Sequence, residues 1–221
     1  RGTGTMTYET IVFDLDGTLT DPAVGITGGV RYALGKFGIA EEDWEKLCAF
    51  IGPPLKESFQ KFYGFTPKEI EEATGFYREY YGRQGKFENR VYDGIPQMLS
   101  RLHSAGKRLC LATYKGEGTA REILDYFGLT SCFCKIAGQR MGSEELQKSQ
   151  MIEGILEELE TSHKERAVMV GDRRHDADAA RESGIHSIGV LYGYGSKEEL
   201  SGAGAEILAA DVKELERLLL G

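Results

Sequence analysis

Short apolar segments rich in β-branched residues alternate with helical patterns along most of this chain. Apolar runs of this length between helices are typical of strands buried on both faces of a parallel sheet. The expected strands cover residues 10–13, 108–113, 133–138, 167–171, 186–192 and, more weakly, 205–209. The expected helices between them cover residues 94–105, 117–127, 144–159, 176–183 and 212–220. This alternation predicts an α/β fold with a doubly wound, mainly parallel, Rossmann-like sheet.

The alternation is interrupted between Pro22 and Asn89, where the sequence shows no convincing strand. An insert of roughly 70 residues is too long for an ordinary crossover between two strands. Its helical patterns cover residues 23–36, 41–50, 54–63 and 67–84. The sequence therefore predicts two parts, an α/β catalytic core formed by residues 1–20 and 90–221 and an all-helical cap formed by residues 21–89.

Composition limits the classes of partner. The chain of 221 residues has 27 basic and 35 acidic side chains, a net charge of -8, which disfavours nucleic-acid binding. No apolar run is long enough to span a bilayer, and the first ten residues lack the apolar stretch of a secretory signal. We expect a cytoplasmic protein, monomer or homodimer, that binds neither nucleic acid nor membrane.

The four cysteines are scattered, which suits a reducing compartment. Two of them belong to the segment CFC at residues 132–134, which offers a weak hint of a metal site. A strand explains this segment better, because alternate residues of a strand place both sulfur atoms on one face.

The segment IVFDLDGTLTD, at residues 11–21, ends an expected strand with two carboxylates. Ligands of parallel sheets bind beyond the carboxyl ends of the strands, where Asp14 and Asp16 are expected to lie. Two carboxylates forced together repel each other unless a cation or a proton lies between them. Gly17 permits a turn that directs backbone N–H groups toward an anion. The segment can therefore hold both a divalent cation and a phosphate, whereas a pair of capping aspartates is the structural alternative.

Three segments carry a resemblance to a known family. DLDGTLTD, LCLATYK and MVGDRRHDADAA, which begin at residues 14, 109 and 169, resemble the first, second and fourth motifs of the haloacid dehalogenase-like phosphatase superfamily. The segments GIPQMLSRLHSAGKRLCLAT and ESGIHSIGVLYGYGS also resemble its phosphoglycolate-phosphatase-like branch. The resemblance covers essentially the whole chain, including the position of the helical insert.

The resemblance implies a role for each motif residue. Asp14 would be the nucleophile that forms an aspartyl-phosphate, and Asp16 the general acid and base. An aspartate at the second position favours phosphoryl transfer over carbon–halogen cleavage, because a halide leaves without a proton. Thr113 would donate its hydroxyl to the transferring phosphoryl group. Mg²⁺ is the implied cofactor, with Asp14, Asp16 through its backbone carbonyl, Asp172 and Asp176 as ligands.

Two lysines compete for the role of neutralising the phosphate. The family's third motif falls at Lys148, near the start of an expected helix, and such helix starts face the carboxyl ends of the strands. Lys115 follows Thr113 closely and is the second candidate, and a solvated surface position is the structural alternative for either lysine. Asp172 also suits the N-cap of a helix that begins near residue 174, a position compatible with metal binding.

Further residues are expected to contact the phosphate or the substrate. They are Leu15, Gly17, Thr113, Tyr114, Lys115 and Lys56. Tyr114 stands where the family branch usually has Ser or Asn. Lys56 belongs to FIGPPLKESF, at residues 50–59, which resembles the loop and helix start that cover the substrate in the family. Closure of this cap would exclude bulk water before the reaction.

The implied function is a Mg²⁺-dependent phosphatase that hydrolyses a small phosphomonoester, such as phosphoglycolate or a nucleoside monophosphate, through an aspartyl-phosphate. A pyrophosphatase, a phosphonatase and a sugar phosphomutase of the same superfamily are alternative enzymes. A metal-dependent binding protein is the non-enzymatic alternative, although the complete set of motif residues argues against it.

Overall fold

A computed structural model describes residues 7–221, so the stretch searched for a secretory signal lies largely outside the described residues. The described residues divide into two compact units, one formed by residues 7–19 with Val91–Gly221 and the other by Thr20–Arg90. None of the helices within residues 7–221 combines the length and the hydrophobicity that a membrane crossing requires.

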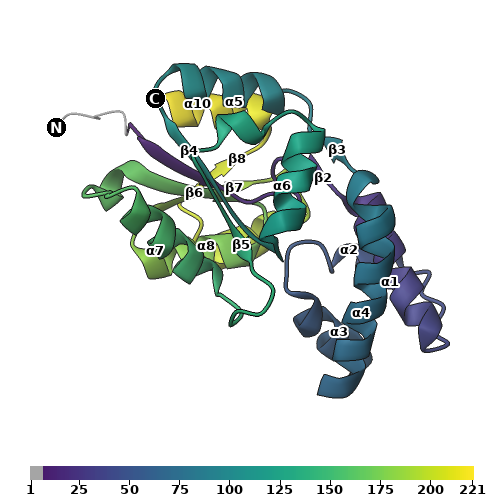
Figure 1. Ribbon diagram of the computed structural model, residues 1–221. Helices are drawn as coiled ribbons and strands as arrows, with labels where there is room; N and C mark the ends of the chain where they lie inside the picture. Colours follow the sequence, from purple (N-terminus) through teal and green to yellow (C-terminus); the bar gives the residue numbers. More distant parts are fainter. Residues whose placement is uncertain (1–6) are drawn as a thin grey trace. The chain divides into compact units, whose positions relative to one another are not determined.

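The first unit is built on a six-stranded sheet with the order β5-β4-β1-β6-β7-β8 (Figure 1). Every neighbouring pair of strands is parallel. The strands are β1 (Thr10–Phe13), β4 (Arg108–Gly116), β5 (Lys135–Gln139), β6 (Ala167–Gly171), β7 (His186–Val190) and β8 (Ile207–Ala209). The expected α/β fold with a parallel sheet is confirmed.

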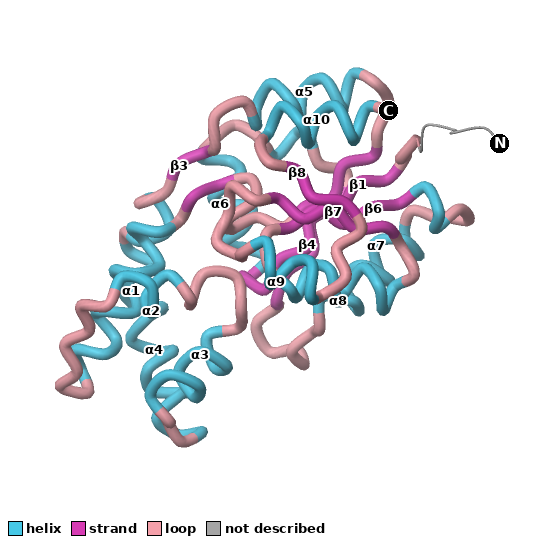
Figure 2. Tube along the Cα trace, turned by 180° about the vertical axis from the view of Figure 1, so that it is seen from behind, coloured by secondary structure: helices cyan, strands magenta, loops and turns pink. Residues whose placement is uncertain are grey.

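Helices cover both faces of this sheet because successive strand residues point to opposite sides. On β1, Ile11 and Phe13 join one hydrophobic cluster and Val12 joins another. The first cluster includes side chains from α5 (Ile95–Ser104), α6 (Glu117–Tyr126) and α10 (Val212–Leu220). The second includes side chains from α7 (Lys148–Glu158) and α8 (Arg174–Ser183). Figure 2 shows α5 and α10 on one side of the strands and α7 and α8 on the other.

The second unit is the expected helical insertion. It contains α1 (Ala23–Lys36), α2 (Trp44–Cys48), α3 (Leu55–Tyr63), α4 (Pro67–Arg83) and the 3₁₀ helix η1 (Gly85–Phe87). Aromatic rings form much of its core, with Phe59 stacked on Phe65 at a centroid distance of 5.7 Å. A capping box in which Thr66 accepts from Glu69 N starts α4. Two short strands, β2 (Thr20–Asp21) and β3 (Arg90–Val91), pair at the ends of the insertion.

Several expected boundaries were wrong. The helix expected at 144–159 begins only at Lys148, because Gln139 binds both the N–H and the carbonyl of Leu146 and holds the preceding segment as a loop. The helix expected at 41–50 covers only α2, which Asp43 caps by accepting from Lys46 N. The sequence also missed α9 (Lys197–Gly202).

The strand interpretation of CFC was also wrong. Cys132 ends the 3₁₀ helix η2 (Thr130–Cys132), and Cys134 precedes the first residue of β5. The two cysteines therefore do not alternate along one strand. A further 3₁₀ helix, η3 (Lys164–Arg166), leads into β6.

Candidate active site

Three parallel strands deliver polar residues to one edge of the sheet. Phe13, the last residue of β1, lies opposite Leu111 of β4 and Val170 of β6. The N–H of Asp14 donates to the carbonyl of Val170 at 2.9 Å, which continues the pairing for one more residue. The shared register places Asp14, Thr113 and Asp172 at the carboxyl edge of the sheet, where ligand sites of α/β folds form.

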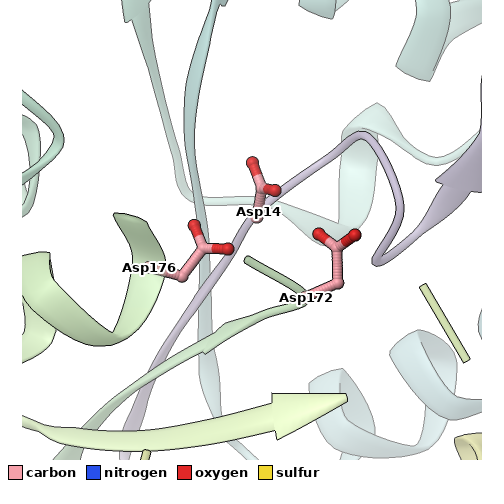
Figure 3. Close-up of side chains that lie close together, drawn as sticks. All are labelled: Asp14, Asp172 and Asp176. Carbon is pink, nitrogen blue, oxygen red and sulfur yellow. The ribbon is translucent and has the colours of Figure 1, made fainter. Parts of the chain in front are cut away.

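Three buried carboxylates meet at this edge. Asp14 follows β1, Asp172 follows β6 and Asp176 lies in the first turn of α8. Each offers an oxygen atom, and these oxygens all lie within 4.8 Å of one another (Figure 3). All three side chains are buried. Such a cluster of like charges is stable only when cations or protons offset the repulsion.

Lys148 supplies one of these compensating charges. Its Nζ atom donates to Asp14 Oδ1 at 3.0 Å and to Asp176 Oδ1 at 2.7 Å. Burial by itself would lower the pKa of Lys148, but the two carboxylates outweigh burial and raise the pKa above its ordinary value. Lys148 is therefore a fixed positive charge between the end of β1 and the start of α8.

One lysine does not neutralise three carboxylates. Burial, followed by repulsion from Asp176, raises the pKa of Asp14 well above its usual range. The same two causes, in the same order, raise the pKa of Asp172 to about 7. The protein thus holds an excess of negative charge that a proton or a metal ion stabilises.

The donor set fits a hard divalent cation. Within residues 7–221, the buried atoms Asp14 Oδ2 and Asp16 Oδ1 have no hydrogen-bond partner. Buried polar atoms in native proteins nearly always have a partner, so these two oxygens indicate a place where a bound ligand, either a cation or the substrate, meets the carboxylates. Carboxylate oxygens are the ligands that Mg²⁺ prefers. The buried cluster of Asp14, Asp172 and Asp176 is therefore a candidate metal site.

The turn after β1 packs closely against Asp172. Gly17 has a φ of 84°, and a Cβ atom at this position would clash with the Asp172 carboxylate. Thr18 and Leu19 donate their N–H groups to the carbonyl of Leu15 at 3.2 and 2.9 Å, which closes the turn. The side chain of Leu15, expected near the substrate, is buried in the hydrophobic core.

Two groups orient the Asp172 carboxylate. Thr18 Oγ1 donates to Asp172 Oδ1 at 3.3 Å, and the N–H of Tyr194 donates to Asp172 Oδ2 at 2.8 Å. Sequence reasoning missed Tyr194, and its only signal was the glycine-rich segment GYGS at residues 193–196. The structural alternative for Asp172, the N-cap of α8, was wrong. Arg173 is the N-cap residue, and its N–H donates to Asp176 Oδ2 at 3.1 Å.

Both candidate lysines lie at the carboxyl edge, on different carboxylates. Lys115 Nζ lies 2.9 Å from Asp16 Oδ2, whereas Lys148 contacts Asp14 and Asp176. The N–H of Lys115 also donates to Thr113 Oγ1 at 3.1 Å. Lys115 therefore contacts Asp16 through its side chain and Thr113 through its backbone.

The ring of Tyr114 lies against Lys148. Lys148 Nζ lies 5.0 Å from the centre of the Tyr114 ring, a cation–π distance, and the His175 ring meets that ring edge-on at 5.9 Å. Tyr114 therefore lies beside the carboxylate cluster, in contact with Lys148. Lys56 belongs to the helical unit, where it is exposed on α3.

The sequence and the fold are similar to those of known hydrolases. A family model described as haloacid dehalogenase-like hydrolase matches residues 11–190. A 5'-nucleotidase of Pseudomonas aeruginosa is 42% identical over 96% of this chain and 96% of its own length. The tyrosine-protein kinase PtkA of Mycobacterium tuberculosis is 37% identical over 96% of this chain and 72% of its own length.

A phosphoglycolate phosphatase of Agrobacterium fabrum is 30% identical over 83% of this chain and 80% of its own length. Among solved structures, a predicted phosphatase of Clostridium acetobutylicum superposes with a TM-score of 0.92 at 42% identity. That match covers 97% of this chain and 99% of the other.

Proposed function

This chain belongs to the haloacid dehalogenase-like hydrolases and is a phosphatase, and we propose that it hydrolyses a small phosphomonoester in a Mg²⁺-dependent reaction through an aspartyl-phosphate. The observation that carries the proposal is the buried cluster of Asp14, Asp172 and Asp176, with Lys148 in contact with two of them. A metal-dependent binding protein would need the carboxylates but not a nucleophile in reach of them.

Asp14 has the features of the nucleophile. Its Oδ1 atom is held by Lys148, and its Oδ2 atom is buried without a hydrogen-bond partner among the described residues. An oxygen without competing hydrogen bonds is available for attack on phosphorus, and the resulting acyl phosphate divides hydrolysis into two displacements. Mg²⁺ held by Asp14, the Asp16 carbonyl, Asp172 and Asp176 would supply positive charge beside the transferring group.

Asp16 is the proposed general acid and base. The Nζ atom of Lys115 lies 2.9 Å from Asp16 Oδ2, and Asp16 Oδ1 has no hydrogen-bond partner within residues 7–221. In the first step Oδ1 would protonate the leaving alkoxide, and in the second it would accept a proton from the attacking water. Thr113 would donate its hydroxyl to the phosphoryl oxygens, because Thr113 Oγ1 already accepts from Lys115 N and keeps its own proton free.

Nucleoside 5'-monophosphates are the substrate class that we favour over phosphoglycolate. The 5'-nucleotidase of Pseudomonas aeruginosa shares 42% identity over nearly all of both chains, against 30% for the phosphoglycolate phosphatase. Phosphate release from a panel of nucleotides, phosphoglycolate, pyrophosphate and sugar phosphates tests the assignment. A specificity constant for pyrophosphate or phosphoglycolate above that for every nucleotide would contradict it.

We predict that Asp14→Asn abolishes Mg²⁺-dependent phosphate release. The amide cannot act as the nucleophile, so turnover should fall on the order of 10³-fold or more. Asp178→Asn is the matched control, because Asp178 lies on α8 near Asp176 but pairs with Arg181 on the surface of the protein. Equal turnover by Asp14→Asn and the wild type would exclude Asp14 as the nucleophile.

Transfer to a tyrosine is the second candidate reaction. The 37% identity to the protein named as a tyrosine-protein kinase favours it over phosphonate cleavage and sugar-phosphate isomerisation. Both phosphatase and kinase reactions can pass through a phosphorylated Asp14, and they differ in the acceptor. Incubation with labelled nucleoside triphosphate and a tyrosine-containing protein separates them, since a phosphatase releases labelled inorganic phosphate and a kinase leaves the label on tyrosine.

We further propose that residues 1–20 and 90–221 form the catalytic core and that residues 21–89 act as a cap that selects the leaving group. The exposed Lys56 is the proposed cap contact for the leaving group of phosphoglycolate, which is negatively charged, and not for a nucleoside, which is uncharged. Lys56→Ala should therefore raise the KM for phosphoglycolate more than the KM for phenyl phosphate, whose leaving group has no carboxylate. An equal change in both values would remove Lys56 from substrate recognition.

A further inference from the structure

Two cysteines lie in contact across β4 and the segment that enters β5. Cys110 Sγ and Cys134 Sγ are 3.6 Å apart. The N–H of Cys134 donates to the carbonyl of Leu109 at 2.9 Å, so the backbone of β4 fixes the position of Cys134. Cys110 is fully buried in β4, whereas Cys134 is exposed. The pair therefore joins one thiol that solvent reaches and one that it does not.

The surroundings separate the two thiols chemically. The hydrogen bond from the Cys110 thiol lowers the pKa of Cys134 to about 6, and the positive charges of Arg108 and Lys135 act in the same direction. Donating this bond raises the pKa of Cys110, and burial raises it further. Of the two thiols, the exposed one is therefore the more readily deprotonated, and the thiolate is the reactive form of cysteine.

We propose that Cys134 and Cys110 form a peroxide-sensitive thiol pair that closes reversibly into a disulfide between β4 and β5. This inference is independent of the proposed function, because neither thiol takes part in phosphoryl transfer.

The reaction balances with hydrogen peroxide as the oxidant. The Cys134 thiolate attacks one peroxide oxygen, the O–O bond breaks, and the hydroxide that leaves takes up a proton as water. The sulfenic acid formed on Cys134 is then attacked by Cys110, which loses its proton. A second water leaves as the S–S bond forms. Two thiols and one peroxide thus give one disulfide and two waters, and an added dithiol restores both thiols.

The geometry permits closure with a small movement. A disulfide has an S–S length of about 2.05 Å, so the sulfur atoms must approach by about 1.5 Å. Cys110 is held in a strand between two neighbours and packs in the cluster beneath α7 and α8. Cys134 lies in the connection before β5, which is an edge strand of the sheet. We therefore expect Cys134 to move when the disulfide forms, and β4, which leads to Thr113, to stay in place.

The test treats the reduced full-length protein with hydrogen peroxide, blocks the remaining thiols with an alkylating reagent and analyses the digest by mass spectrometry. We expect a cross-linked peptide pair containing Cys110 and Cys134 that lacks the mass of two hydrogens and that dithiothreitol separates. Peroxide treatment of the wild type that leaves these residues unlinked, or that links Cys132 or Cys48 instead, would overturn the proposal.

Cysteine variants test which of the two thiols reacts first with peroxide. Cys134→Ser changes an exposed residue and should leave Cys110 unoxidised, because the buried thiol does not meet peroxide directly. Cys110→Ala removes the thiol that lowers the pKa of Cys134, so Cys134 should be oxidised more slowly and should then remain a sulfenic acid that dimedone traps. Cys132→Ser is the matched control and should form the cross-link as the wild type does, since burial raises the pKa of Cys132. A peroxide-reactive Cys110 in Cys134→Ser would contradict the assigned order.

Discussion

Lys148 shows how much of the site depends on a single side chain. Its ammonium group lies between Asp14 and Asp176 and is almost completely buried. The desolvation of a buried charge is repaid only when its partners are close, and here both partners lie at hydrogen-bond distance. The same ammonium would contact phosphoryl oxygens if the substrate approaches Asp14, so we propose that Lys148 serves both stability and catalysis.

We predict that Lys148→Met lowers both the stability of the protein and its rate of turnover. Removal of one partner from a buried ion pair costs about 3–5 kcal/mol, and loss of a positive charge beside the phosphoryl group lowers turnover by about 10²–10³-fold. Urea unfolding and phosphate release measure the two effects. Lys213→Met, at an exposed position on α10, is the control and should change neither quantity. Wild-type turnover in a folded Lys148→Met protein would refute the catalytic role.

Tyr114 illustrates what a motif alone does not decide. Its position after Thr113 predicts a substrate contact, which stays a prediction, and the structure places its ring against Lys148 and His175. Lys148 lies on α7 and His175 on α8, so these contacts depend on where the two helices pack. The segment LCLATYK contains no information about that packing.

At the scale of elements, the turn between β1 and α1 depends on one glycine. Gly17 adopts a positive φ, and a side chain there would also collide with Asp172. The segment therefore combines a backbone requirement with a packing requirement, and the two can be separated experimentally.

Gly17→Ala should destabilise the protein and weaken Mg²⁺ binding, whereas Gly142→Ala should show only the backbone cost. Gly142 also has a positive φ, 77°, but a Cβ atom there would meet open space in the described part of the chain. An alanine in this backbone region costs about 1–2 kcal/mol, and only Gly17→Ala adds displacement of the Asp172 carboxylate. Urea midpoints and Mg²⁺ titration provide the comparison, and equal effects of both variants would reject the packing argument.

Element boundaries were predictable where local sequence alone decides them. The strands at 10–13 and 167–171 and the helices at 23–36 and 212–220 have the bounds expected from their apolar patterns. The expected start of the helix before Lys148 was wrong, because Gln139 of β5 binds the Leu146 backbone from outside the helical segment. Local periodicity contains no information about such a bond.

At the scale of the whole molecule, the buried acidic cluster couples folding to pH and to metal. Asp172 has a raised pKa of about 7 in the folded chain, against 3.8 for the ordinary group. The folded metal-free protein therefore binds more protons than the unfolded chain between about pH 4 and pH 7, and its free energy of unfolding should fall as the pH rises through this interval. Lys148 reduces this effect without reversing its direction.

Mg²⁺ should oppose this loss, because its ligands must be deprotonated. We expect the increase in Tm on addition of Mg²⁺ to be larger near pH 8 than near pH 5, where Asp172 holds a proton that competes with the ion. Thermal unfolding with and without Mg²⁺ at both pH values measures the difference. A Mg²⁺-induced shift that is equal or larger at the lower pH would contradict a metal site at Asp172.

The sequence by itself determined the parallel α/β architecture, the helical insertion and the identity of the acidic motif residues, because apolar periodicity and short motifs are properties of neighbouring residues. Only the tertiary structure decided that Lys148 contacts Asp14 and Asp176, that Lys115 contacts Asp16, and that Cys110 and Cys134 lie in contact. Strand register and loop paths set these distances, and both arise from packing between segments that are far apart in the chain.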